Sequence, residues 1–452
     1  MAGDVCGHVV WTAELPVGRG GWCCWRPVAA GRERCRWHAT GALDDYASAL
    51  DQSDDRLDDA VLRGEDLDSL PIDGCSLARA DLAGATLSTT VESGCLRGAD
   101  LSDATLDHAD LSGADLRDAT LAGATLLHAD LSAARLRHAD LSGADLRFAA
   151  ASAPSLVRAD LTDANASGAD LSDATLLSAR LEAATFRRTD LSGGNLRRAD
   201  AVAADLGSAD VRGADLYEAD LRDADLRGAD LSGANLRHAH LSGADLSDAD
   251  LTDATLEGAD LRGATLERAE FVRTNLFDAD LSRAVLYGGV FADVKVNRGT
   301  VLDAPRPTGA DDDPLDELVW TNRTIERLSR ENALVEQART AYVRRKDLRR
   351  RQHRRQGNYA RWAGSAVAGA VMGYGERPLR VVAVSAAVVF AAALLYPGPL
   401  SEAAYASLAS FVTPLPDPSL GTTGRWLSAM EALTGALLTA VLVFVFGRRS
   451  TG

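Results

Sequence analysis

Apolar residues recur at every fifth position along most of the chain. From Leu96 to Phe291 the spacing holds through forty pentads, and the weakest centres are Ala151, Ala166 and Ala201. A small residue, usually alanine, stands two positions before each centre, and Asp, Thr or Asn stands between the two. A period of five fits neither a helix, which repeats every 3.6 residues, nor a strand, which repeats every two. It predicts a chain that turns a corner after each pentad.

The same period begins earlier in a different phase. Apolar residues stand at five-residue steps from Leu57 to Leu87, and the next step, to Leu96, is nine residues, one short of two pentads. We interpret Ser88–Cys95 as a local irregularity within one continuous stack of pentads.

The pentad Ala99-Asp100-Leu101-Ser102-Asp103 resembles the repeat of the pentapeptide-repeat proteins. This resemblance implies a right-handed, four-sided β-helix, a quadrilateral solenoid with four pentads per coil. Forty pentads then form about ten coils, and the uninterrupted part is on the order of 50 Å long at the usual spacing between strands.

Four pentads per coil would stack residues that are twenty positions apart. Aspartates then form two ladders on walls two pentads apart, one with Asp100, Asp140, Asp160, Asp200, Asp220, Asp260 and Asp280, the other with Asp110, Asp130, Asp170, Asp190, Asp210, Asp230 and Asp250. An arginine-bearing edge between the acidic walls is predicted from Arg97, Arg117, Arg137, Arg197 and Arg237, either as a docking edge or as a solvated stripe. The histidines His108 and His128 are also expected to stack. Like charges one strand apart repel, and salt screens that repulsion.

The charge of the chain is uneven. The formal net charge is -17, of which residues 1–300 carry -22 and residues 301–452 carry +5. Only two lysines occur, Lys295 and Lys346. An acidic, lysine-poor surface suggests a halophilic protein in a salt-rich cytoplasm, although a GC-rich genome also replaces lysine with arginine. Acidity alone identifies no partner, because most acidic surfaces are solvated.

Residues 1–50 form a Cys/His segment that is a candidate zinc-binding cap. Zinc prefers four sulfur or nitrogen ligands in a tetrahedron, and a short segment with few aliphatic residues gains stability from a metal. The alternative is a reduced, packed cysteine cluster. The candidate ligands are Cys6, Cys23, Cys35 and His38, with Cys24 as an alternative to Cys23.

After the solenoid, assigned to residues 55–300, comes a proline-containing linker over 301–314. A basic helical connector is expected over 315–375, with apolar residues at helical spacing from Leu318 to Tyr342. Eight Arg/Lys residues lie between Arg344 and Arg355. Because an apolar stretch follows them, we expect this run to lie beside anionic membrane lipid rather than nucleic acid.

Residues 376–452 are expected to form a membrane domain with two transmembrane helices. The segments Leu379–Tyr396 and Trp426–Phe446 are apolar enough to span a bilayer. Arginines flank their outer ends, and the loop between them holds only Arg425. The positive-inside rule therefore predicts a multi-pass protein of the cell membrane with both termini and the solenoid in the cytoplasm.

This domain resembles the two-helix pore of potassium-channel-like membrane proteins that also carry pentapeptide repeats. The matching stretches are 372–378, 395–397, 405–408 and 426–433. The resemblance implies an ion-channel domain that works as an oligomer, a tetramer by analogy. Prolines replace the glycines of the usual selectivity filter, and they cannot present the same column of carbonyl oxygens. The filter-equivalent residues are Thr413, Pro414, Leu415, Pro416 and Asp417, and Glu431 is a candidate membrane-embedded acid.

Two functions from different classes remain open. The chain is either a channel-like protein whose cytoplasmic solenoid senses or recruits an unknown partner, or a membrane-tethered scaffold with no transport. A third hypothesis is an acidic DNA-mimic protein of the kind that the pentapeptide-repeat resemblance allows. An enzyme is not expected, because the sequence has no phosphate-binding glycine loop, nucleophile elbow or metal-binding His-Glu helix motif.

Overall fold

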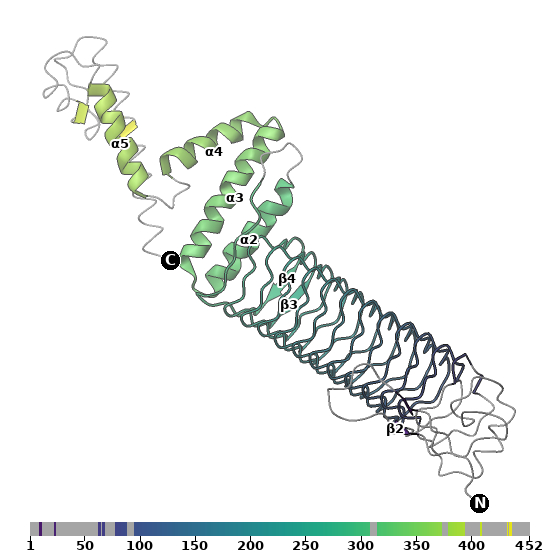
Figure 1. The fold of residues 1–452 in the computed structure, drawn as a ribbon. Coiled ribbons are helices and arrows are strands. Elements are labelled where there is room, and N and C mark those ends of the chain that lie inside the picture. The colour runs from purple at the N-terminus through teal and green to yellow at the C-terminus, as the bar shows by residue number, and fades with distance from the viewer. Residues whose placement is uncertain are drawn as a thin grey trace, which may run out of the picture. The chain divides into compact units, whose positions relative to one another are not determined.

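The computed structural model describes residues 9–10, 22–23, 62–64, 66–67, 77–87, 95–307, 314–372, 378–393, 407–408, 432 and 434–435. The chain divides into two compact units, Met1–Pro305 and Arg306–Gly452. The first contains the antiparallel pair β1 (Val9–Val10) and β2 (Trp22–Cys23) and a long solenoid (Figure 1). The second contains the helices α2 to α5.

The solenoid repeats every twenty residues. Parallel bridges join Asp100 to Thr120 and Thr105 to Thr125, and the same spacing continues to Asp260 and Asp280. Each pentad contributes one bridging residue, so each coil has four walls. Two strands near its C-terminal end are longer, β3 (Glu270–Val272) and β4 (Val290–Ala292), and they pair in parallel. The corner after each pentad that the period of five predicts is confirmed, and so is the four-sided β-helix that the resemblance to pentapeptide-repeat proteins implies.

Leucine and alanine fill the interior, as the pattern predicts. Leu106 and Leu111 are completely buried, and so are the small residues Ala104 and Ala109. Burying one leucine side chain stabilises a fold by about 1.5–3 kcal/mol relative to exposing it. Because each coil contacts only its neighbours, this stabilisation accumulates coil by coil.

Every corner in the described part of the solenoid places the second residue after the pentad centre in the left-handed region. At Asp103 φ is 56°, at Ala133 it is 54°, and at Gly168 it is 70°. The turn closes through a hydrogen bond from the next inward residue to the centre, as from Ala104 N to Leu101 O at 3.1 Å. A positive φ at the third of four residues is the mark of a type II turn, which favours Gly, Asn or Asp at that position.

Two irregularities interrupt the twenty-residue register. Thr86 pairs with Thr105, nineteen residues away, so one residue is missing between them and the stack continues. This confirms the interpretation of Ser88–Cys95 as an irregularity within a single solenoid. At the other end Asp280 pairs with Val301, twenty-one residues away.

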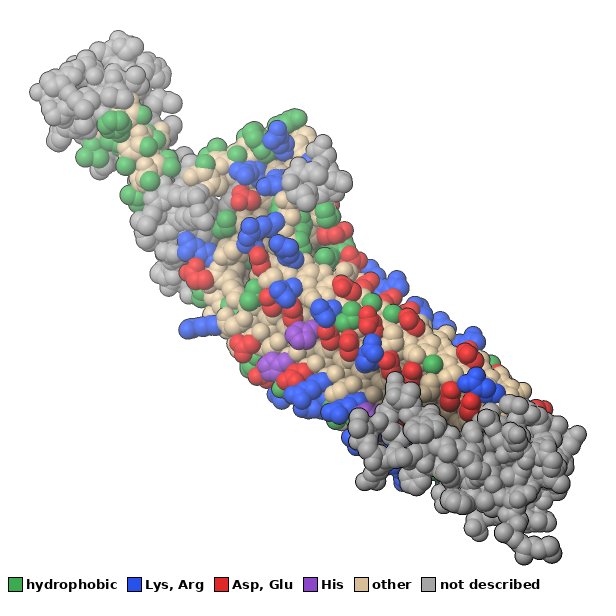
Figure 2. Space-filling view, in the orientation of Figure 1, with side chains coloured by type: hydrophobic (Ala, Val, Ile, Leu, Met, Phe, Trp, Pro, Cys, Tyr) green, Lys and Arg blue, Asp and Glu red, His purple; other side chains and the backbone are tan. Residues whose placement is uncertain are grey.

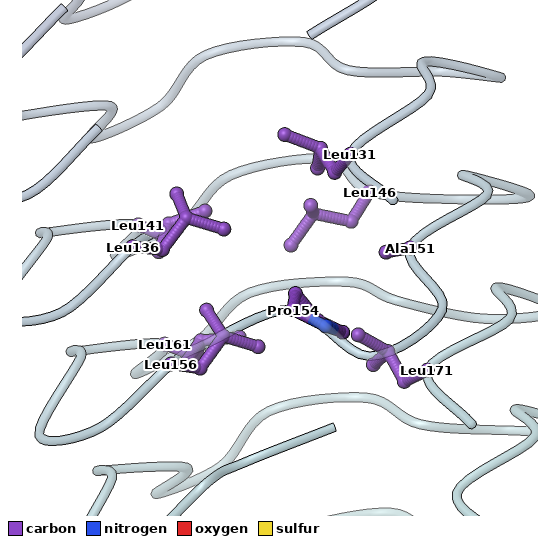
Figure 3. Close-up of a pocket in the computed structure, with 9 residues that line it drawn as sticks. All are labelled: Leu131, Leu136, Leu141, Leu146, Ala151, Pro154, Leu156, Leu161 and Leu171. Carbon is purple, nitrogen blue, oxygen red and sulfur yellow. The ribbon is translucent and has the colours of Figure 1, made fainter. Parts of the chain in front are cut away.

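A small apolar cavity lies where the interior residue Ala151 replaces a leucine. Its volume is about 10 Å³, and Figure 3 shows it enclosed by leucines and Pro154. All of its lining is apolar, so the cavity offers a water molecule no hydrogen-bond partner. The lining residues are Leu131, Leu136, Leu141, Leu146, Ala151, Pro154, Leu156, Leu161 and Leu171.

The second unit begins with a helical hairpin, α2 (Leu315–Glu331) and α3 (Val335–Arg355). Leu315, Leu318 and Leu348 form its apolar core. The helices α4 (Tyr359–Met372) and α5 (Pro378–Ala393) follow, with α4 in contact with α3 and α5 in contact with α4. The helical connector predicted after residue 315 is present, since α2 starts at Leu315.

No helix within the described ranges is both long and apolar enough to cross a bilayer. The first predicted span, Leu379–Tyr396, coincides with α5, of which 16 residues are described. The second, Trp426–Phe446, lies outside the described residues apart from 432, 434 and 435.

Candidate interaction surfaces

An aspartate placed before a pentad centre fixes the turn that follows it. Its Oδ1 accepts a hydrogen bond from the backbone N–H two residues later, as Asp190 does from Ser192 at 2.9 Å. A serine or threonine at that later position also donates its hydroxyl, as Ser172 does to Asp170 at 2.6 Å. Asp is favoured at turns because its side chain makes these local hydrogen bonds. They explain why Asp is abundant in the repeat without requiring a binding partner.

Six pentads carry an aspartate and an arginine on either side of an inward residue. In all six the arginine Nη2 lies 2.5–2.7 Å from Oδ2 of its own aspartate, and the pairs are Asp115–Arg117, Asp145–Arg147, Asp210–Arg212, Asp220–Arg222, Asp225–Arg227 and Asp260–Arg262. The guanidinium of Arg227, through its hydrogen bonds, lowers the pKa of the Asp225 carboxyl. Exposed pairs of this kind contribute only about 0–1 kcal/mol, so their main effect is to fix side-chain positions.

The five stripe arginines have the predicted register, since backbone bonds link residues 98 to 117 and 118 to 137. They are not a run of uncompensated cations, however. Four of them lie within 3.3 Å of a carboxylate, in the pairs Arg97–Asp118, Arg117–Asp115, Arg197–Asp215 and Arg237–Glu257. Arg137 instead donates from Nε to Nε2 of His138 at 3.2 Å. Carboxylates therefore compensate most of the charge along this edge, because arginine is long enough to reach a carboxylate on its own or the next coil, and docking at this edge stays a prediction.

Of the two aspartate ladders, the one that contains Asp170 and Asp190 is the more continuous. Six carboxylates from Asp170 to Glu270 are bridged one coil after another. Arg212 lies 2.5 Å from Asp210 and 3.8 Å from Asp230, and it is the sole arginine partner that the described residues give this ladder. The first ladder is interrupted, because Thr120, Arg180 and His240 occupy its gaps. Figure 2 accordingly shows acidic and basic side chains mixed over much of the visible solenoid surface.

The predicted stack of His108 and His128 is confirmed, and it continues to Phe148. The ring centroids are 5.3 Å apart between the two histidines and 5.4 Å apart between His128 and Phe148, with nearly parallel planes. Phe148 is 55% exposed. Sequence reasoning missed this third ring, although its place twenty residues after His128 was the signal for it.

A carboxylate links the helices α2 and α3. Glu326 accepts hydrogen bonds from Nε and Nη2 of Arg345 at 3.0 and 2.7 Å, and Arg330 Nη2 lies 2.9 Å from its other oxygen. The guanidinium of Arg345 also lies 5.5 Å from the centre of the Tyr342 ring. This cluster uses Arg345 of the basic run for internal structure, and Arg350 of the same run lies 3.5 Å from Asp347.

The predicted zinc ligands and filter residues cannot be placed. Cys6, Cys24, Cys35 and His38 lie outside the described residues, and of Cys23 only the backbone is described, in β2. No group of His, Cys, Asp and Glu suited to a metal occurs within the described ranges. The candidate pore residues Thr413, Pro414, Leu415, Pro416, Asp417 and Glu431 also lie outside those ranges.

Solved structures similar to this chain include pentapeptide-repeat proteins. HetL, a protein involved in heterocyst differentiation regulation from the cyanobacterium Nostoc sp. strain PCC 7120, is 35% identical over 43% of this chain and 86% of its own, with a TM-score of 0.27. A thylakoid-lumen protein of Arabidopsis thaliana is 32% identical over 30% of this chain and 71% of its own, with a TM-score of 0.18. No curated protein matches the chain.

The family assignment rests on the sequence of the solenoid and on its geometry. The family model for pentapeptide repeats matches residues 95–132, 114–149, 155–193, 179–216, 195–233, 229–268 and 256–293. The same region forms coils of four pentads with leucine and alanine inside. This chain is a pentapeptide-repeat protein, and its solenoid is the right-handed β-helix of that family.

Proposed function

We propose that this protein is an interaction scaffold whose solenoid is a rigid docking platform held at a membrane. The observation that carries the proposal is the fixed surface of the solenoid. Aspartates cap the turns, and six of them also hold an arginine of the same pentad. A surface whose side chains are already ordered loses little conformational entropy when a partner binds, which favours recognition by a preformed face.

The docking role is testable by comparing two walls. A photo-crosslinking residue at Ser172 or Ser192 would report on the acidic ladder, and one at Thr175 or Asn195 would report on a more neutral wall. In cells, we expect one wall to give a discrete crosslinked product and the other to give none. Equal, diffuse labelling from both walls would contradict the docking role.

Membrane attachment is supported by the second unit. The helix α5 exposes Val382 and Phe390, and the basic run of α3 precedes it in the chain. Exposed apolar helices next to arginine-rich segments are typical of proteins that contact anionic bilayers. We expect the full chain to stay with membranes after alkaline extraction and a chain ending at Gly375 to be released. Release of the full chain would refute attachment.

A pore is the second candidate, and one contact favours it. Ser407 is completely buried, and its hydroxyl donates to the Val389 carbonyl of α5 at 2.8 Å. Ser407 thus contacts that helix, as a residue of a re-entrant pore segment would. The test is ion flux through purified full-length protein in liposomes at high salt, with the chain ending at Gly375 as control.

Flux that requires the C-terminal residues and changes in Glu431→Gln would support a pore, with an oligomer of two-span subunits around it. Absence of flux from intact, oligomeric protein would exclude transport and leave the scaffold. The DNA-mimic hypothesis receives less support, because arginines offset many of the aspartates that suggested it.

A further inference from the structure

The outward side of α4 is apolar. Tyr359 is 66% exposed and Val367 is 61% exposed, and Ala360, Ala363 and Ala370 are exposed on the same side of the helix. Residues three, four, seven and eight positions apart share one helical face, so these side chains form one continuous strip. A helix that faces water normally carries polar groups on that strip. Figure 2 shows hydrophobic side chains along this helix.

Exposed arginines lie on either side of the corner that begins α4. Arg351 and Arg354 lie in the last turns of α3, and Arg361 lies in the first turn of α4. Among the residues described, none of the three has a carboxylate within ion-pair distance, in contrast to Arg345, which Glu326 holds. These three cations are therefore available to an anionic partner outside the chain.

The corner between the helices holds these groups in a defined arrangement. Gly357 has a φ of 68°, and Asn358 N donates to His353 O at 2.8 Å, which closes the end of α3. The side chain of Asn358 then accepts a hydrogen bond from Arg361 N at 3.4 Å and caps the start of α4. Glycine at the C-terminal stop and asparagine at the next N-cap are the residues that such a corner requires.

We propose that α4 lies in the interface of an anionic bilayer. Its apolar strip enters the boundary between headgroups and acyl chains, and Arg351, Arg354 and Arg361 contact lipid phosphates. A helix with an apolar face and arginines outside that face binds such surfaces by burying apolar area and by attraction to anionic lipids. A nucleic acid would use the arginines but would leave Val367 and the alanines in water. The proposal rests on the proposed membrane attachment, and it adds the class of lipid and the residues that bind that lipid.

Hydrogen exchange of α4 in the full chain is the direct measurement. Purified protein is compared with vesicles of phosphatidylcholine alone and with vesicles containing roughly one-third phosphatidylglycerol. We expect anionic vesicles to protect the amides of α4 and phosphatidylcholine vesicles to leave them unchanged. High salt should weaken the protection, because it screens the arginines.

Two variant sets make the test specific. Arg351→Gln, Arg354→Gln and Arg361→Gln together should lower the protection of α4 by up to about 100-fold, since one arginine near an anionic surface is worth about fivefold. The matched control removes the same charge from exposed solenoid arginines, Arg158, Arg188 and Arg283, and should change nothing. Val367→Asp should abolish the protection, and Val367→Leu should keep it.

The outcomes separate this inference from the proposed function. Vesicle binding with no lipid-dependent protection of α4 would leave the attachment standing and overturn the inference. Equal loss in the control triple would overturn it too, because net charge rather than position would then decide binding. Protection that appears without vesicles as protein concentration rises would identify a second copy as the occupant. Absence of any vesicle binding would overturn both proposals.

Discussion

A ring that lies over a glycine gives a sharp test of how the solenoid corners pack. Gly168 has a φ of 70°, and a Cβ added there would lie 2.7 and 2.8 Å from two ring carbons of Phe148. Gly213 occupies an equivalent corner with a φ of 64°, and a Cβ added there meets nothing within 4 Å. The substitutions Gly168→Ala and Gly213→Ala therefore differ mainly in the ring of Phe148.

The expected difference in stability comes from the stacking contact that the Phe148 ring must lose. Both substitutions share the cost of placing alanine in the left-handed region, about 1–2 kcal/mol. Only at Gly168 must Phe148 also rotate away and lose its stacking on His128, which is worth about 0.5–1.5 kcal/mol. We expect Gly168→Ala to be less stable than Gly213→Ala by about 1 kcal/mol. For a domain of this size, that corresponds to an unfolding midpoint lower by roughly 2–4 °C.

Thermal unfolding followed by circular dichroism measures this difference. Each substitution is made alone and together with Phe148→Ala, which forms a double-mutant cycle. The two glycine variants should become equally stable once the ring is removed. Equal stability while Phe148 is present would refute the steric argument, and an excess cost at Gly168 that survives removal of the ring would assign it to the backbone instead.

Three other substitutions test the helical hairpin and the acid response. Ala333→Gly should stabilise the hairpin by about 0.5–1 kcal/mol, because alanine there has a φ of 57°, and slower hydrogen exchange in α3 would show it. Arg345→Leu should lower the stability of the hairpin by about 2–3 kcal/mol, because the charge of Glu326 is then poorly compensated. Adding Glu326→Leu should recover much of that stability, as measured by hydrogen exchange in α3. Arg227→Gln should destabilise the solenoid at neutral pH. Because the pKa of Asp225 is lowered in the folded state, that pair stabilises above the ordinary pKa of Asp and is lost as pH falls through the lowered value. The deficit of Arg227→Gln should therefore vanish in strong acid, and a deficit that persists unchanged in chemical unfolding curves there would contradict the assignment.

The solenoid could be predicted because each pentad determines its own structure from residues that are close in sequence. A pentad contains its own inward residues and its own turn, so the period identifies the inward positions and the corners. The resemblance to pentapeptide-repeat proteins adds four pentads per coil and therefore the residues that stack. The nine-residue step before Leu96 could be read for the same reason. One missing residue shifts the pairings across it to nineteen residues, as in Asp81–Asp100 and Thr86–Thr105, and the twenty-residue register resumes from Cys95–Asp115. The stack of His108 and His128 likewise followed from the twenty-residue spacing.

The electrostatics of the surface were not predictable from that register. The stripe of arginines was located correctly, but its charge depended on where each side chain reaches. Arg117 folds back onto Asp115 of its own pentad, and Arg197 reaches Asp215 on the next coil. Stacking order specifies which residues are neighbours, whereas ion pairing depends on rotamers and on the competition between nearby carboxylates.

The sequence by itself determined the repeat, the interior of the solenoid, the start of the helical unit and the uneven charge. Only the tertiary structure decided which charges are neutralised and which face of α4 is exposed. The reason is physical. A five-residue pattern dictates inward and outward positions in every coil, but the environment of a long polar side chain, or of one face of an isolated helix, depends on elements that are distant in sequence.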